Sequence, residues 1–96
     1  DTEFFYKFTS FTCPGTIYRY SFEDRRSSVF REIRLPNFDP NKFSVDQVFY
    51  SSKDGTRVPM FIVTGKDMVR DGSAPIYLYG YGGFDISINP FFSSIM

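Results

Sequence analysis

The sequence predicts a β-rich chain, with two groups of strands on either side of a boundary. Three observations support this. Aromatic and β-branched residues alternate with polar residues in most segments, as they do in half-buried strands. No segment shows convincing helical periodicity. A cluster of proline and asparagine at residues 36–41 separates the two groups, because it opposes regular structure.

Three strands are expected before this boundary. Residues 4–11 read FFYKFTSF and form the first strand. The Cys-Pro-Gly sequence at 13–15 is a turn signal that ends it, and residues 16–22, TIYRYSF, form the second strand of a hairpin. Residues 23–28 are polar and predict a turn. Residues 29–35, VFREIRL, alternate apolar and charged side chains and form the third strand.

Two more strands are expected after the boundary. Residues 43–50 form the first, and residues 56–63, TRVPMFIV, form the second. The turn at 51–55 ends in Asp-Gly, a strong hairpin signal. Pro59 removes one hydrogen-bond donor from the ladder and therefore favours an edge or bulge position. Residues 65–74 are polar and predict a loop.

A short apolar run at residues 75–79, PIYLY, has little alternation, which is typical of a strand buried on both faces. It leads into a glycine-rich loop, where residues 79–84 read YGYGGF. Three glycines in four residues indicate a positive φ or a close backbone approach. The loop lacks the spacing of a dinucleotide-binding turn and the Gly-Lys-Ser/Thr ending of a phosphate-binding loop, so nucleotide binding is disfavoured.

The same loop fits a second chemistry. In α/β-hydrolases, the loop after the third strand supplies the donors that stabilise an oxyanion, and a tyrosine hydroxyl can donate where a backbone N–H does not reach. The alternative, judged from spacing alone, is that Tyr79 and Tyr81 are ordinary packing residues in a β-protein.

Composition excludes several classes of site. Lys and Arg number 11 and Asp and Glu number 11, so the net charge is zero and gives no electrostatic reason to expect nucleic acid or an anionic membrane. The sequence has no His, so no Ser-His or Cys-His nucleophile forms within these residues, and a metal site is not expected. The single Cys13 indicates an inert thiol and a reducing compartment. No spanning segment or secretory signal is recognised.

A family resemblance covers essentially all 96 residues in one order. Residues 49–56, FYSSKDGT, and 58–63, VPMFIV, resemble the opening hairpin of the prolyl oligopeptidase catalytic domain. Residues 79–84, YGYGGF, followed by 86–90, ISINP, are similar to the oxyanion loop of that family. Parts of residues 10–32 resemble its last propeller blade.

The resemblance implies that residues 1–35 close a seven-bladed β-propeller and that residues 36–96 begin an α/β-hydrolase domain. By position in the motif, Tyr81 corresponds to the oxyanion donor of the family. Phe84 corresponds to the residue that lines the pocket for the substrate proline ring, the alternative being core packing. Tyr79 is expected to be a buried strand residue.

The sequence departs from the family pattern in two ways. Asp85 stands where Asn is expected, so a carboxylate beside the pocket either alters substrate preference or is simply solvated. The nucleophile elbow, the acidic residue and the His of the family are absent, and in the family they lie C-terminal to this segment. Three serines, Ser87, Ser93 and Ser94, are therefore not expected to be nucleophiles.

The expected parent protein is a cytoplasmic, monomeric serine endopeptidase that cuts short peptides after proline, without cofactor, metal, nucleic acid or membrane. Two alternatives remain open at this point. One is a related oligopeptidase with another specificity, such as one that prefers basic residues, or an acylpeptide hydrolase. The other is a non-catalytic β-rich module that binds peptides through its aromatic strands.

Overall fold

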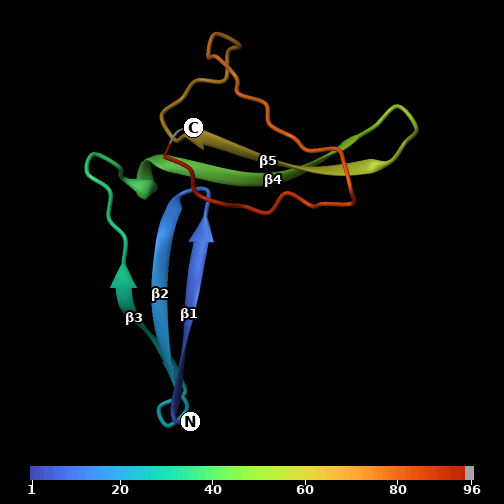
Figure 1. Ribbon diagram of the computed structural model, residues 1–96. Coiled ribbons are helices and arrows are strands. Elements are labelled where there is room, and N and C mark those ends of the chain that lie inside the picture. The colour runs from blue at the N-terminus through green and yellow to red at the C-terminus, as the bar shows by residue number, and fades with distance from the viewer. Residues whose placement is uncertain (95–96) are drawn as a thin grey trace.

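The computed structural model describes residues 1–94, which form two antiparallel sheets followed by an irregular segment (Figure 1). The first sheet has the strand order β1-β2-β3, with β1 (Glu3–Ser10), β2 (Cys13–Ser21) and β3 (Arg26–Glu32). The second sheet pairs β4 (Phe43–Ser51) with β5 (Arg57–Gly65) after a short 3₁₀ turn, η1 (Pro40–Lys42). The five strands agree with the sequence prediction to within a few residues at each end.

One face of the first sheet is an aromatic ladder. Phe4 lies opposite Tyr20 and Tyr6 lies opposite Tyr18, with ring centroids 5.1 and 5.2 Å apart. Phe22 extends the cluster by packing on Phe4. Cross-strand aromatic pairs of this kind stabilise antiparallel strands, and they explain why the tyrosine-rich segments pair in this register.

The turn of the first hairpin lies earlier than the sequence predicted. Ser10 pairs with Cys13, so residues 11–12 form the turn and the Cys-Pro-Gly sequence belongs to β2. The prediction that residues 13–15 interrupt the strands was therefore wrong.

A β-bulge explains how a proline is accommodated in β2. Pro14 and Gly15 together face the single residue Thr9, since the neighbouring pairs are in register on either side. Gly15 has φ 152°, and a Cβ atom there would lie 2.8 Å from the Cε atom of Lys7. The extra residue of a bulge is not paired in the ladder of hydrogen bonds between the strands. The missing backbone N–H of Pro14 is therefore tolerated at this position.

The hairpin of the second sheet has the turn that its Asp-Gly signal predicts. The Ser52 N–H donates to the Thr56 carbonyl at 2.8 Å, and the Gly55 N–H donates to the Ser52 carbonyl at 2.9 Å. Gly55 adopts φ 85°, which glycine reaches without steric cost. Pro59 lies in β5, which pairs only with β4 among the described residues, and its missing N–H lies opposite Phe49 in this two-stranded sheet.

The apolar run at 76–79 is not a strand, so this prediction was wrong. The segment is irregular, and the side chains of Ile76 and Leu78 are 90% and 83% exposed. A run without alternation forms a strand where neighbouring strands pair with it and other elements cover both faces. No element among residues 1–94 pairs with this segment.

Apolar contacts between distant segments are few. Phe11 in the first hairpin packs on Phe61 of β5, with centroids 5.4 Å apart. Near the start of β4, Phe38 stacks on Phe43 and also contacts Phe92, which holds the returning C-terminal segment there (Figure 1). No apolar side chain among residues 1–94 is buried, so the described residues have no core of their own.

Candidate functional site

The glycine-rich loop brings the two predicted site residues together. A shallow hollow is lined by residues 81–87, which include both Tyr81 and Phe84. The Tyr81 side chain is 47% exposed and the Phe84 side chain is 90% exposed. Both rings are therefore open to a ligand rather than packed into a core.

The backbone of this loop is left-handed at positions that are not glycine. The Ile86 N–H donates to the Gly83 carbonyl at 3.2 Å and closes a turn, in which Phe84 has φ 56° and Asp85 has φ 54°. A positive φ is an outlier for a bulky aromatic residue and costs on the order of 1–3 kcal/mol. The turn therefore fixes where the Phe84 ring emerges from the chain.

The glycines of the loop show neither of the two features that the sequence predicted, a positive φ or a close backbone approach, within residues 1–94. None of Gly80, Gly82 and Gly83 has a positive φ, so that part of the prediction was wrong. At position 83, a Cβ atom would lie 3.8 Å from the ring and the hydroxyl of Tyr81. A distance of 3.8 Å is an ordinary van der Waals contact, and a Cβ atom at Gly80 or Gly82 would meet nothing within 4 Å, so no close approach among residues 1–94 requires glycine in this loop.

The Tyr81 hydroxyl is available as a donor. Within the part of the chain that the structure describes, it makes no hydrogen bond. Tyr79 is also open, at 53% exposed and outside any strand, so the prediction of a buried strand residue was wrong. No element among residues 1–94 covers the apolar run at 76–79, so Tyr79 is exposed together with the rest of that run.

No histidine base accompanies the serine in this hollow, although the Asp85 carboxylate also lines it. Ser87 lines it beside Tyr81, but the sequence contains no His. Ser93 and Ser94 follow in the segment after the hollow, and neither lines it. Among residues 1–94 no group of His, Cys, Asp or Glu side chains could hold a metal ion. No helix of the described chain is long and apolar enough to cross a membrane.

Two carboxylates have perturbed pKa values, and both lie in turns outside the hollow. The backbone N–H and the side chain of Thr56, with the side chain of Ser52, lower the pKa of Asp54. The side chain and then the backbone N–H of Ser73 lower the pKa of Asp71. Hydrogen bonds to the ionised form favour it, so these groups stabilise turns rather than supply proton transfer.

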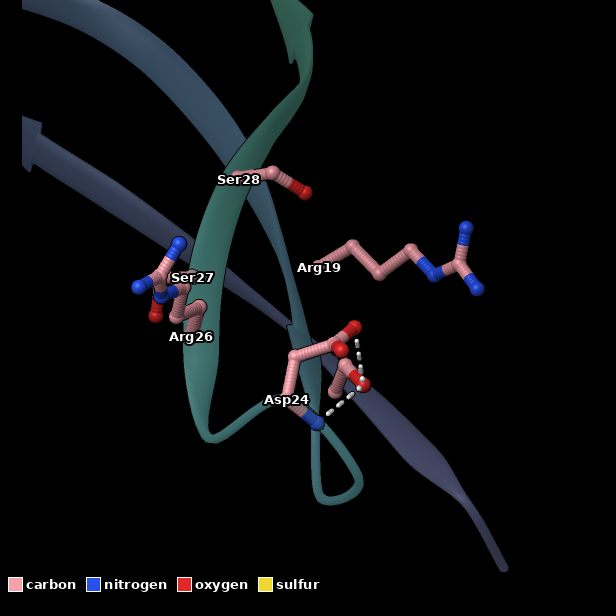
Figure 2. A pocket seen from close by; sticks show the side chains of 6 residues that line it. Arg19, Asp24, Arg26, Ser27 and Ser28 are labelled. Carbon is pink, nitrogen blue, oxygen red and sulfur yellow. Dashed lines mark hydrogen bonds between the residues drawn. The ribbon is translucent and has the colours of Figure 1, made fainter.

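A second hollow lies at the far end of the first sheet, where β2 turns into β3 (Figure 2). Its lining is wholly polar or charged, and comprises Arg19, Ser21, Asp24, Arg26, Ser27 and Ser28. Sequence reasoning assigned most of these residues to a polar turn. The hollow was not predicted, because Arg19 comes to lie beside Ser28 only through the pairing register of β2 and β3.

No protein-family model matches the chain. Curated relatives do. The chain is 50% identical over 96 residues to prolyl oligopeptidase A of Galerina marginata, and 40% identical over 95 residues to the prolyl endopeptidase of Elizabethkingia miricola. These matches cover 97% and 99% of the chain but 13% of each relative. The chain is homologous to one segment of the prolyl oligopeptidases.

Solved structures extend this relationship to the arrangement of the strands. Prolyl oligopeptidase B of Galerina marginata, bound to a 35mer substrate, matches 99% of the chain with a TM-score of 0.89 and 47% identity. Oligopeptidase B of Leishmania major matches 97% with a TM-score of 0.81 and 28% identity. The chain spans 14% of the first of these two structures and 13% of the second.

Proposed function

We propose that this chain is a segment of a serine-type endopeptidase that hydrolyses short peptides on the carboxyl side of proline. The observation that carries the proposal is its similarity to prolyl oligopeptidases over nearly its whole length, with both sheets superimposable at a TM-score of 0.89. Because the chain spans 13% of these relatives, the activity belongs to the full-length protein.

The proposal assigns the two sheets to two domains. Residues 1–35 would complete a β-propeller, and residues 36–96 would supply the first strands and the oxyanion loop of an α/β-hydrolase domain. The separate hydrogen-bonding of β1-β2-β3 and β4-β5 supports this division.

Tyr81 is the proposed oxyanion donor. A serine elsewhere in the full-length protein attacks the carbonyl carbon of the substrate proline, and the carbonyl oxygen becomes negative. The Tyr81 hydroxyl, which has no partner within residues 1–94, would donate a hydrogen bond to that oxygen. Such a donor stabilises the transition state more than the ground state, which raises kcat.

Phe84 is the proposed wall of the proline pocket. Its ring is 90% exposed and lies in the same hollow as Tyr81. A flat apolar ring suits the apolar face of a pyrrolidine ring. The left-handed backbone at Phe84 would hold the ring in one place before substrate binds.

The test is Tyr81→Phe in the full-length protein, measured with a proline-containing peptide. We expect kcat to fall by roughly 10²-fold or more, with KM changed much less, because the lost donor acts on the transition state. Tyr79→Phe is the matched control, since it removes a hydroxyl two residues away and should leave kcat unchanged.

Unchanged kcat in Tyr81→Phe would remove Tyr81 from the mechanism while leaving the peptidase proposal standing. Cleavage after Arg in preference to Pro would favour an oligopeptidase of other specificity, although the lower identity to oligopeptidase B argues against it. A full-length protein that binds proline peptides without cutting them would favour the binding module.

A second reaction is supported by two relatives. The dual function macrocyclase-peptidases of Galerina marginata and Amanita bisporigera are each 48% identical to the chain, close to the values for the prolyl oligopeptidases. An acyl-enzyme attacked by an amine of the substrate, rather than by water, gives a cyclic peptide. Mass analysis of products from a long peptide separates the two outcomes, because hydrolysis adds one water to the released peptide and cyclisation adds none.

A further inference from the structure

The turn between β2 and β3 contains a serine with the sequence surroundings of a kinase substrate. Residues 25–29 read Arg-Arg-Ser-Ser-Val, so two arginines precede Ser28 by three and two positions and an apolar residue follows it. Basophilic protein kinases select this pattern, because acidic side chains in their substrate groove pair with the arginines.

The fold leaves Ser28 accessible on an extended strand, and Arg25 lies in the preceding turn with φ 51°. Ser28 lies on β3, which forms the edge of its sheet among residues 1–94. It is exposed, and the following Val29 is 59% exposed. Edge strands present an extended backbone with unpaired groups, and an extended peptide can add to another surface there.

The two neighbouring serines differ in their partners. The Ser27 hydroxyl accepts a hydrogen bond from the Tyr6 hydroxyl at 3.0 Å, on the aromatic face of the sheet. The Ser28 hydroxyl has no hydrogen-bond partner in the part of the chain that the structure describes. Ser28 is therefore the free nucleophile of the pair.

A cationic group lies directly opposite Ser28. Arg19 of β2 is its cross-strand partner, so both side chains project from the same face of the sheet. Figure 2 shows Ser28 and Arg19 on one side of β3. Arg19 is ion-paired with Glu3 of β1, and about half of its side chain remains exposed.

We propose that Ser28 is a phosphorylation site for a basophilic serine/threonine kinase, and that Arg19 receives the phosphate. The Ser28 hydroxyl attacks the γ-phosphorus of ATP, the bond to ADP breaks, and the hydroxyl proton is released. The phosphate then competes with Glu3 for the Arg19 guanidinium. Asp24, which lines the same hollow and bonds to Ser21, opposes the added charge.

The experiment treats the full-length protein with ATP and the catalytic subunit of cyclic-AMP-dependent kinase, and follows intact mass and the modified peptide. We expect a phosphoryl group on Ser28. Ser28→Ala should abolish it, and Ser27→Ala, the matched control, should retain it. Arg25→Gln should slow incorporation about tenfold or more, because a charge-assisted contact to the kinase is lost.

A second readout tests the role of Arg19. The ³¹P signal of the phosphorylated protein should titrate at lower pH than that of the phosphorylated Arg19→Gln variant, because a nearby guanidinium favours the dianion. Equal titration in the two proteins would overturn the assignment of Arg19. Incorporation into Ser28→Ala at the wild-type rate would overturn the site. So would phosphorylation of a free peptide of residues 22–32 when the folded protein takes none.

Discussion

At the scale of single residues, the turn after Gly83 contains the main departure from ordinary backbone geometry in the candidate site. Phe84 and Asp85 are both left-handed. Asp and Asn tolerate this region far better than most residues, because their short polar side chains bond locally. An Asp or an Asn at position 85 therefore serves the turn equally, and the two differ mainly in charge.

This difference permits a clean test of whether the Asp85 carboxylate influences substrate choice. In the full-length protein, Asp85→Asn should lower kcat/KM for peptides with a Lys near the proline and raise it for peptides with a Glu there. The expected change is up to about fivefold, the effect of an exposed ion pair worth roughly 1 kcal/mol. It should appear mainly in KM and shrink at high salt.

Asp67→Asn is the control, because Asp67 is an exposed carboxylate in the loop after β5 and outside the hollow. Equal responses of the two variants would show that overall charge, rather than position 85, sets the preference. No response in either would mean that the Asp85 carboxylate is only solvated.

At the scale of elements, the turn between β4 and β5 depends on one carboxylate. The Thr56 N–H donates to Asp54 at 3.0 Å, and the hydrogen bonds from Thr56 and Ser52 lower the pKa of Asp54. A lowered folded-state pKa means that the stabilisation is complete above the ordinary pKa of Asp, about 3.9, and is lost as pH falls through the lowered value.

Thermal unfolding of the full-length protein between neutral and acidic pH checks this sign. Asp54→Ala should lower the melting temperature slightly at neutral pH, and the difference from wild type should shrink once the pH falls below the lowered pKa. Lys53→Ala is the control, since it lies in the same turn without these hydrogen bonds. A difference that grows on acidification would contradict the argument.

The strands that could be predicted from sequence are those whose stability is local. The segments of β1, β2, β4 and β5 alternate, so pattern alone locates them, although the Cys-Pro-Gly signal did not mark the turn between β1 and β2. The segment 76–79 has a pattern that depends on covering layers from elsewhere, and here it stays irregular.

The candidate site, like the strands, was predicted from the sequence only in part. The YGYGGF motif predicted Tyr81 and Phe84 as site residues, and the structure places both in one hollow. The left-handed backbone at Phe84 could not be predicted, because bulky residues rarely adopt it. The pairing of Ser28 with Arg19 required the cross-strand register, which sequence does not supply directly.

At the scale of the whole chain, the two sheets share little apolar contact. The elements that contact each other extensively are paired strands within one sheet, and no apolar side chain of residues 1–94 is buried. Burial of apolar surface is the main favourable term in folding. The aromatic ladder around Phe4 and Tyr20 therefore needs a covering layer that the described residues do not provide.

This shortage of core leads to a prediction for the isolated 96-residue chain. A two-stranded sheet is marginal in water, and exposed sheet edges with apolar faces favour association. We expect the chain alone to aggregate or to unfold without a cooperative transition, and to show no peptidase activity. Calorimetry and sedimentation velocity measure both properties. A sharp thermal transition in a monomer would show that the two sheets stabilise each other, and turnover by the pure chain that resists serine-peptidase inhibitors would require a catalytic group other than the proposed serine.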